Sequence, residues 1–410
     1  MSTGSSDTPP VYNKGPLEGV RVLELGSLLA GPFACRLLGD FGAEIIKVES
    51  PDAPDLMREW GPHRFRGRTL LWPIQSRNKK CITLNLREAE GQDLFRRLVK
   101  HSDILFENFR PGTMEKWDLG WDNLSTVNPG LIMTRVSGFG QTGPYKDRTG
   151  FGSVGEAIGG IRYLTGFPDR PPVRTGVSLG DALAALFATI GTLSALDHRR
   201  RTGRGQVVDC AITEAVFSLM ESMLPEYDLL GVIRERVGAI LPKVAPSNIY
   251  PTADGKMLLI AANGDAIFRR LALVMGRPEL ADDPRYATHA ARGERQAELD
   301  DIIAAWTAQH QMEELWTMLN DAAVPAGPIY SIADIAHDPQ FIARGMIRTM
   351  RDPELGDLKV PGIVPQLSET PGVMKWTGPS TPGIHNREVY GDLLGLSDQD
   401  LERLAKAGII

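Results

Sequence analysis

Short apolar runs alternate with amphipathic segments along the first third of the chain, and this alternation restricts the fold more than any other feature. From Gly19 the sequence reads VRVLEL, then the loop GSLLAGP, then FACRLLGDF and GAEIIKVE, which predicts a β-α-β unit. Pro32 suits the first turn of the predicted helix, and Gly42 suits its C-terminal end. A second unit runs through CITLNLR, EAEGQDLFRRLVKH and DILFENF, and a further strand through LIMTRVS. Strands alternating with helices predict an α/β fold with an open, parallel, Rossmann-like sheet.

The remainder of the chain contains an apolar helical segment, followed by a region rich in turns and a final polar helix. The segment DALAALFATIGTLSALDHRR, from Asp181 to about Arg200, is rich in Ala and Leu on nearly all sides, which predicts a helix buried by its neighbours or by another subunit. Between about Val237 and Pro328, Pro and Gly turns, the hairpin-like NIYPTADGKMLLIAA and three helical segments predict a second, smaller α+β domain. A polar helix is expected at LSDQDLERLAKAG.

Composition narrows the class of protein. The net charge of -6 gives no global attraction for nucleic acid, and no segment reaches the roughly 18 uninterrupted apolar residues expected of a membrane helix. The opening residues carry no targeting pattern, so we expect a polar arm and a cytoplasmic protein. Cys35, Cys81 and Cys210 are widely spaced, which is typical of buried free thiols in a reducing compartment.

The stretch GFGQTG, from Gly138 to Gly143, matches the G-x-G-x-x-G pattern of a dinucleotide-binding turn and follows a predicted strand. The next residues, PYKDR, are polar and turn-like, so no helix is expected to aim its amides at a pyrophosphate. NAD binding is therefore disfavoured, and a mobile glycine-rich loop is the preferred interpretation. No metal-binding or P-loop motif is present in the sequence.

Charged residues cluster near the predicted strand ends. The run from Arg77 to Lys80, together with Arg87 and Lys116, could hold phosphates at the edge of the sheet, although a solvated basic surface explains it equally well. Asp181, in GVSLGDALAAL, begins a helical segment, where Asp is a favoured N-cap. The helix dipole also keeps such a carboxylate ionised, as a nucleophile requires, so the two roles are compatible.

These blocks together resemble the family III CoA-transferases, of the formyl-CoA and carnitine CoA-transferase (CaiB/BaiF) type. The resemblance rests on PLEGVRVLELGSLLAGPFACRLLGDFGAEIIKVE, SRNKKCITLNLR, ENFRPG, SGFGQTGPY, GVSLGDALAAL, TGRGQVVD, VPAGPI and AHDPQF, and covers residues 16–410. It implies a large domain made from both chain ends, a small domain between them, and two subunits interlocked like rings, as a homodimer or with a related second subunit. The expected boundaries are an arm over residues 1–15, the large domain over 16–225 and 331–410, and the small domain over 226–330.

The resemblance also implies a site. Asp181 would be the nucleophile that forms an aspartyl-CoA thioester, with coenzyme A as substrate and no metal or NAD. The expected CoA-binding residues are Leu29, Ala30, Ser50, Leu84, Asn85, Leu86, Arg87, Asn108, Phe109, Arg110, Lys116 and Arg148. Gly138, Gly140 and Gly143 would form an active-site loop, where small residues and free amides can approach an oxyanion.

Differences between this sequence and the patterns of individual subgroups indicate which reaction of the family to expect. Racemases need a histidine where this chain has Phe151, and a phenyl ring cannot act as a base. Formyl-CoA transferases carry glutamine in place of Leu29 and a glycine-run loop that this chain lacks. The segment FGSVGEAIGGIRYLTGFPDRPPVRTG is similar to the subgroup using succinyl-CoA and dicarboxylates such as malate, citramalate or itaconate. We expect that reaction, with formyl-CoA/oxalate or carnitine transfer, or racemisation, as alternatives.

Overall fold

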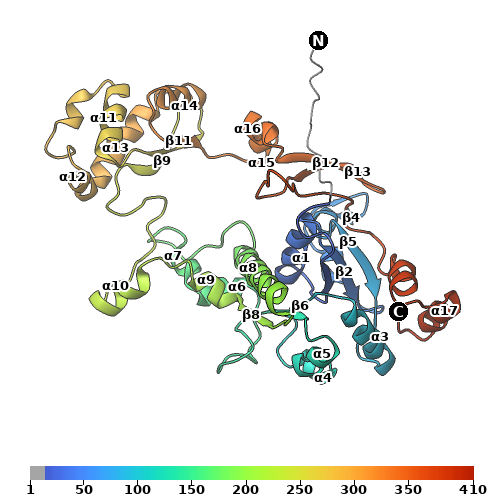
Figure 1. Cartoon of the computed structure of the whole chain (residues 1–410). Helices are drawn as coiled ribbons and strands as arrows, with labels where there is room; N and C mark the ends of the chain where they lie inside the picture. Colours follow the sequence, from blue (N-terminus) through green and yellow to red (C-terminus); the bar gives the residue numbers. More distant parts are fainter. Residues whose placement is uncertain (1–13) are drawn as a thin grey trace, which may run out of the picture. The chain divides into compact units, whose positions relative to one another are not determined.

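The computed structural model describes residues 14–410, so the expected arm lies outside the described residues except for Lys14 and Gly15. The chain separates into two compact units (Figure 1). Among the described residues, the large unit contains 14–161, Thr175–Leu224 and Ala343–Ile410. The small unit contains Arg162–Arg174 and Pro225–Ile342.

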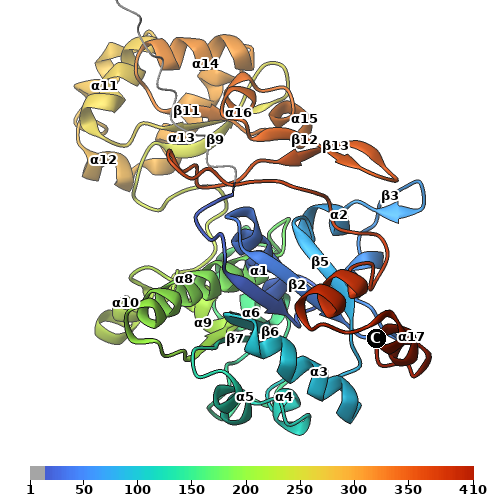
Figure 2. The ribbon, with the colours of Figure 1, turned by 45° about the vertical axis from the view of Figure 1, so that its right-hand side comes forward.

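A six-stranded parallel sheet forms the centre of the large unit (Figure 2). Its strands are β1 (Arg21–Glu24), β2 (Glu44–Glu49), β5 (Lys79–Thr83), β6 (Ile104–Glu107), β7 (Ile132–Ser137) and β8 (Val207–Ala211). They lie in the order β5-β2-β1-β6-β7-β8, and every neighbouring pair is parallel. Counted along the chain, this is the 3-2-1-4-5-6 order of a doubly wound sheet. The predicted parallel sheet is confirmed.

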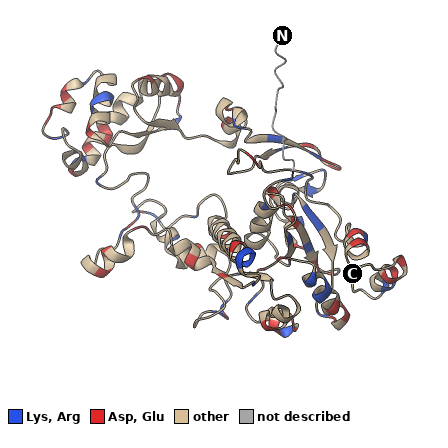
Figure 3. Ribbon diagram, viewed as in Figure 1, with Lys and Arg blue, Asp and Glu red and all other residues tan. Residues whose placement is uncertain are grey.

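Helices cover both faces of the sheet because successive strand residues point to opposite sides. Val22 packs with α1 (Ala30–Asp40) and α8 (Leu179–Thr202), whereas the adjacent Leu23 packs with α3 (Ala89–Lys100) on the other face. The helix α5 (Trp121–Val127) and the C-terminal helix α17 (Asp398–Lys406) also contribute to the α3 face. Both α3 and α17 carry acidic residues in the first turn and basic residues in the last, which complements the helix dipole (Figure 3).

The apolar helix α8 is buried on one side only. Its inner face packs on α1, and Thr192 Oγ1 lies 2.7 Å from Thr134 Oγ1 of β7. Its outer face leaves large apolar side chains exposed, at Leu186, Phe187, Ile190 and Leu193. In the part of the chain that the structure describes, α8 is also the one helix long and apolar enough to cross a membrane. The core helix of a soluble protein can have the same length and composition.

Shorter elements complete the large unit. They are η1 (Leu56–Glu59), β3 (Arg64–Phe65), β4 (Arg68–Thr69), α2 (Leu71–Gln75), α4 (Thr113–Lys116), α6 (Gly152–Ile158), α9 (Ile212–Phe217), the antiparallel hairpin of β12 (Ile347–Asp352) and β13 (Gly356–Pro361), and the π-helical η3 (Arg387–Leu393). Three helices contain the positions in the sequence where the chain passes from one unit to the other: α7 (Ile161–Leu164), α10 (Met223–Leu230) and α16 (Pro339–Ala343). The segment LGDLKVP contains β13.

The small unit has an antiparallel sheet with its own core. The predicted hairpin is present as β9 (Ser247–Pro251) and β10 (Met257–Ala261), and β11 (Ala326–Pro328) pairs with the other edge of β10. Leu258 and Ile260 point from β10 into a core that includes Phe268, Leu299 and Leu315. These come from the helices α11 (Asp265–Val274), α13 (Gln296–Thr307) and α14 (Met312–Asp321). The remaining elements are η2 (Pro278–Ala281), α12 (His289–Glu294) and α15 (Ile332–Ile335).

Candidate active site

The loops after β1 and β6 meet where the strand order of the sheet reverses. In an open α/β sheet, ligands bind in the crevice at the carboxyl ends of the strands at this point. The side chain of Asn108 joins the two loops, because its Oδ1 accepts the Ser27 N–H at 2.8 Å and its Nδ2 donates to the Ser27 carbonyl at 2.9 Å. A Cβ at Gly26 would lie 3.2 Å from Asn108 Oδ1, so glycine permits this close approach.

Two pockets open beside these loops and share Ser27 and Phe109. The first, here the groove pocket, has a volume of about 360 Å³ and is lined by Leu25, Gly26, Ser27, Lys47, Val48, Glu49, Ser50, Ala53, Pro54, Asp55, Leu56, Leu84, Asn85, Leu86, Arg87, Phe109 and Trp117. The second, here the aspartate pocket, has a volume of about 150 Å³ and is lined by Ser27, Leu28, Leu29, Ala30, Asn108, Phe109, Arg110, Pro111, Val136, Ser137, Gly138, Lys146, Arg148, Thr149, Gly150, Phe151, Asp181 and Ile212.

The structure brings most of the expected CoA-binding residues into these two pockets. Ser50 and the segment Leu84 to Arg87 line the groove pocket, whereas Leu29, Ala30, Asn108, Arg110 and Arg148 line the aspartate pocket, and Phe109 lines both. Lys116 lines neither of them: it is exposed at the end of α4, next to Trp117, which lines the groove pocket. Parallel strands end at one edge of the sheet, and this brings together loops that are distant in sequence.

Asp181 lies in the first turn of α8, not at its N-cap. The helix begins at Leu179 with Ser178 in the cap position, so the expectation that Asp181 caps the helix is wrong. The helix does not begin at the Gly180-Asp181 pair, because Leu179 is already helical. A carboxylate in the first turn still interacts favourably with the positive end of the helix dipole.

Gly152 contacts the Asp181 carboxylate and was not singled out from the sequence. It is the first residue of α6, and a Cβ placed on it would lie 2.2 Å from Asp181 Oδ2. Gly155, one turn later, similarly leaves no room for a Cβ because Ile212 is 2.4 Å away. The spacing of glycines within a helical segment is the signal that could have revealed this close packing.

The glycine-rich loop after β7 contributes one of its three glycines to the aspartate pocket. Gly138 lines the pocket and packs tightly against Gly150, whose Cα would be 2.9 Å from an added Cβ. Gly140 adopts a left-handed conformation (φ 86°), and its N–H donates to Ser137 Oγ. Gly143 faces open space. The chain forms no helix between β7 and α6, so the glycines shape a loop.

The run from Arg77 to Lys80 does not provide a phosphate site, contrary to one of the interpretations of the sequence. Arg77 is buried in an ion pair with Asp40, at 2.5 Å, and Lys79 is buried 2.8 Å from Glu24 Oε2. Lys80 pairs with Glu44 and Glu388 at 2.6 and 2.7 Å. Their charges are used in ion pairs within the large unit, and the buried Arg77 and Lys79 require such partners because an unpaired buried charge is costly.

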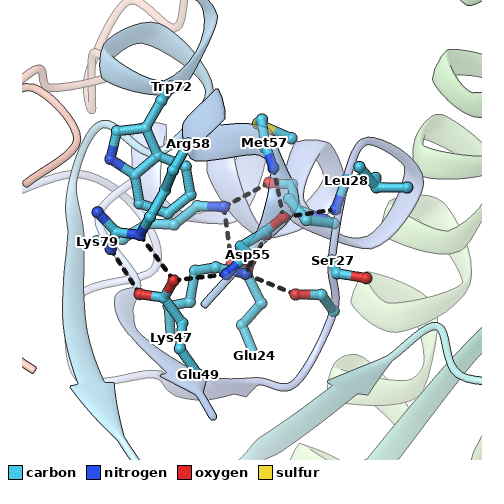
Figure 4. Close-up of polar contacts among 12 residues, drawn as sticks. Glu24, Ser27, Leu28, Lys47, Glu49, Asp55, Met57, Arg58, Trp72 and Lys79 are labelled. Carbon is cyan, nitrogen blue, oxygen red and sulfur yellow. Dashed lines mark hydrogen bonds and ion pairs between the residues drawn. The ribbon is translucent and has the colours of Figure 1, made fainter. Parts of the chain in front are cut away.

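Buried acids support the loops of the site, and sequence reasoning missed them. Glu107, the last residue of β6, pairs with Arg135 at 2.6 Å, and its Oε2 accepts the Phe109 N–H at 2.7 Å. Burial raises the pKa of Glu107 to about 7. Asp55 accepts the N–H of Leu28 at 3.0 Å and pairs with Lys47 at 2.8 Å (Figure 4). Burial opposes ionisation of Asp55, but Lys47 and two backbone N–H groups hold its pKa below the ordinary value.

None of the three cysteines lines the groove pocket or the aspartate pocket. Cys35 and Cys81 are buried and free, as expected, whereas Cys210 is only partly buried. Burial raises the pKa of Cys210 to about 11, so it is a thiol at neutral pH. Within residues 14–410, no group of three or more His, Cys, Asp or Glu side chains is placed to hold a metal ion.

A family model described as CoA-transferase family III matches residues 17–386. The chain belongs to CoA-transferase family III. It is therefore a CoA-transferase, and its substrates are CoA thioesters. Among family III proteins, succinyl-CoA--D-citramalate CoA-transferase of Chloroflexus aurantiacus is 61% identical over 99% of this chain and 100% of its own length. Succinate--glutarate CoA-transferase of Agrobacterium fabrum is 36% identical over 93% of this chain and 96% of its own.

The fold of this family III chain is also found in a crystal structure. A CaiB/BaiF family protein from Brucella suis superposes with a TM-score of 0.82 at 35% identity, covering 93% of this chain and 100% of the other. The resemblance noted in the sequence is therefore confirmed at the level of family and α/β fold.

Proposed function

We propose that this chain moves CoA from succinyl-CoA to a four- or five-carbon dicarboxylate, with Asp181 as the nucleophile. The observation that carries the proposal is the place of Asp181: it lies in the aspartate pocket with the loops after β1 and β6, which continue into the groove pocket. A thioester whose CoA portion occupied the groove pocket would reach Asp181 through Ser27 and Phe109, which line both pockets.

In the proposed reaction the Asp181 carboxylate attacks the succinyl-CoA carbonyl and expels CoA thiolate, which leaves a mixed anhydride. The thiolate attacks the Asp181 acyl carbon, the anhydride C–O bond breaks, and succinate departs from an aspartyl-CoA thioester. The acceptor carboxylate then attacks this thioester, and the returning thiolate takes the acceptor acyl group and regenerates Asp181. Each bond broken is replaced, so no net proton or electron is needed.

The relatives support the choice of substrates. Those named above act, by their names, on citramalate or glutarate together with succinyl-CoA or succinate, and another 44% identical relative is the alpha subunit of a succinyl-CoA--L-malate CoA-transferase. All these acids carry two carboxylates. Lys146 and Arg148 line the aspartate pocket and would supply positive charge for a doubly charged acid.

The CoA contacts are part of the same proposal. Arg87 lines the groove pocket, and Lys116 lies exposed beside its Trp117 wall, so both could pair with CoA phosphates. Arg148 stacks over the Tyr145 ring at 3.7 Å, which places its charge on the glycine-rich loop. The apolar Leu29 would contact the acyl or pantetheine portion.

The assembly is also proposed: a dimer of interlaced subunits, made of two copies of this chain or of this chain and a related one. The exposed apolar face of α8 supports it, because large exposed apolar patches mark interfaces between proteins. The three free cysteines fit a reducing compartment, so we place the enzyme in the cytoplasm.

Trapping the covalent intermediate tests the nucleophile. Incubation with succinyl-CoA and hydroxylamine should convert Asp181 of the wild type to a hydroxamate, detected by peptide mass. Asp181→Ala should lose both the adduct and CoA transfer, whereas Asp197→Ala, an exposed position on the same helix, should retain them. Full transfer activity in Asp181→Ala would rule out this mechanism.

A panel of acceptors tests the substrates. Succinyl-CoA would be offered with malate, citramalate, itaconate, glutarate, oxalate and carnitine, and the new CoA esters read by mass. We expect esters of the four- and five-carbon dicarboxylates to dominate. Transfer only to oxalate or carnitine would favour the alternative family reactions. Deuterium uptake at the α-carbon without any acceptor would favour racemisation, although Phe151 in the aspartate pocket cannot serve as a base.

A further inference from the structure

Six charged side chains form a buried network beneath the loop after β1 (Figure 4). Three are acidic and three are basic, so the charges balance: Glu24, Lys47, Glu49, Asp55, Arg58 and Lys79. Apart from Arg58, whose side chain is 10% exposed, each is at most 1% exposed. They come from β1, β2, β5, η1 and the loop between β2 and η1.

Lys47 is the centre of this network. Its Nζ lies 3.0 Å from Glu24 Oε1 and 2.8 Å from Asp55 Oδ2, and it donates to the Gly26 carbonyl at 2.5 Å. Burial would lower the pKa of Lys47, but the surrounding carboxylates raise it above its ordinary value, so Lys47 is charged. Removing one partner from such a network is costly because the remaining charge is then buried without compensation.

Asp55 connects the network to a strained residue. Its Oδ1 accepts the N–H of Leu28 at 3.0 Å and of Met57 at 2.9 Å. Leu28 has a φ of 63°, a left-handed conformation that costs a residue with a Cβ roughly 1–2 kcal/mol. The hydrogen bonds at Gly26 and Leu28 therefore fix the loop after β1 at two points, and both depend on the Lys47 and Asp55 pair.

The loop held in this way forms part of the candidate active site. Leu28 and Leu29 line the aspartate pocket together with Asp181, and Gly26 lines the groove pocket that Asp55 and Lys47 also border. A largely buried network thus supports the loop that forms one wall of the aspartate pocket. None of its members lies among the residues that line the aspartate pocket.

We propose that Asp55 is a positioning residue for CoA transfer: paired with Lys47, it holds Leu28 in its left-handed conformation and so sets the wall against which the thioester meets Asp181. This inference rests on the proposed function, because it takes Asp181 as the nucleophile. Asp55 acts through Leu28, without contact to the reacting atoms, so its loss should lower kcat and the rate of Asp181 adduct formation.

The test compares two buried Asp→Asn changes in the large unit. Asp55→Asn removes the charge that pairs with Lys47, whereas Asp40→Asn removes the equivalent charge from the buried Arg77 pair, outside both pockets. We expect both variants to melt at lower temperature. Asp55→Asn should lower kcat and the rate of Asp181 adduct formation by about 100-fold, the scale of a misplacement near 1 Å, and Asp40→Asn by less than about threefold.

Substitutions of Leu28 test whether Asp55 acts through the conformation of Leu28. Leu28→Val leaves the charges intact but disfavours a positive φ strongly, so kcat should fall even if Asp55→Asn does not fold. Leu28→Asn tolerates the left-handed conformation, so Asp55→Asn should cost about tenfold less in that background than in the wild type.

The outcomes separate the two proposals. If the wild type neither transfers CoA nor forms the Asp181 adduct, the proposed function fails. If the wild type does both, but Asp55→Asn and Leu28→Val keep the kcat of Asp40→Asn, the function stands and the positioning role is overturned. Equal effects of Asp55→Asn in the Leu28→Asn and wild-type backgrounds would also overturn it.

Discussion

The absence of one Cβ, at Gly152, decides how closely α6 can approach the Asp181 carboxylate. The residue type alone did not reveal this close contact, because glycine within a helix usually destabilises the helix and does not by itself indicate tight packing. The structure shows the reason: any side chain there would overlap the Asp181 oxygens. Gly152 and Asp181 are distant in sequence and meet because α6 packs against α8.

Gly152→Ala should therefore lower the rate of CoA transfer by at least about 100-fold, since it displaces the carboxylate by an ångström or more. Steady-state kinetics with succinyl-CoA would measure the loss, and circular dichroism would check the fold. Gly176→Ala is the matched control, because an added Cβ meets nothing within 4 Å there and φ is not in the left-handed region. Equal activity of the two variants would contradict the prediction.

At the scale of single elements, the C-terminal helix shows how local signals define a boundary. Ser397 and Asp400 form a capping box: Ser397 Oγ accepts the Asp400 N–H, and the Asp400 carboxylate accepts the Ser397 N–H at 3.0 Å. Leu404 of the same helix packs into the core under the sheet. Residues within one turn produce the cap, so the helix at LSDQDLERLAKAG was predictable and is confirmed.

Ser397→Ala should destabilise the large unit by about 1 kcal/mol, because it leaves an N-terminal amide of α17 without its side-chain acceptor. Thermal melting would show the loss, and the kcat for CoA transfer should be unchanged because α17 is outside both pockets. Ser397→Thr keeps an acceptor at the cap and should melt close to the wild type. Equal melting temperatures of Ser397→Ala and Ser397→Thr would argue against a stabilising role for the cap.

At the scale of the whole molecule, α8 is the element whose exposed apolar face requires an explanation. Ile190 is 59% exposed at the centre of that face. Ile190→Asp should split the proposed dimer, because a carboxylate buried in an apolar interface costs several kcal/mol. Molar mass by light scattering would show it, with Arg200→Asp, at an exposed position of the same helix, as the control. A dimer that survives Ile190→Asp would remove α8 from the interface.

His385 links the C-terminal segment to the sheet in a way that depends on pH. Its Nδ1 accepts the Cys81 N–H at 3.0 Å, and burial lowers its pKa below the ordinary 6.5. Because the unfolded chain binds this proton more readily, the contribution to stability is present above about pH 6.5 and is lost as the pH falls through the folded pKa.

Between pH 7 and pH 5 the melting temperature of the wild type should thus fall by about 2 °C more than that of His385→Asn, which keeps an acceptor but does not titrate. Differential scanning calorimetry at both values would measure the two changes, and the other titrating groups are common to both proteins. An equal fall in melting temperature for the wild type and His385→Asn would contradict a role for His385.

The amino-acid sequence by itself determined the elements, the parallel α/β sheet and the family, because hydrophobic periodicity, caps and turns are local and the motif blocks are ordered along the chain. The domain boundaries, the dimer and the residue roles stay predictions. Tertiary structure decided which charges are available to a ligand: Arg77 and Lys79 resemble Arg87 in sequence, but the packing of α1 and β1 brings the buried acids Asp40 and Glu24 to the first two. It also placed Gly152 against Asp181 and Asp55 beneath Leu28, since contacts between distant segments depend on how strands and helices pack.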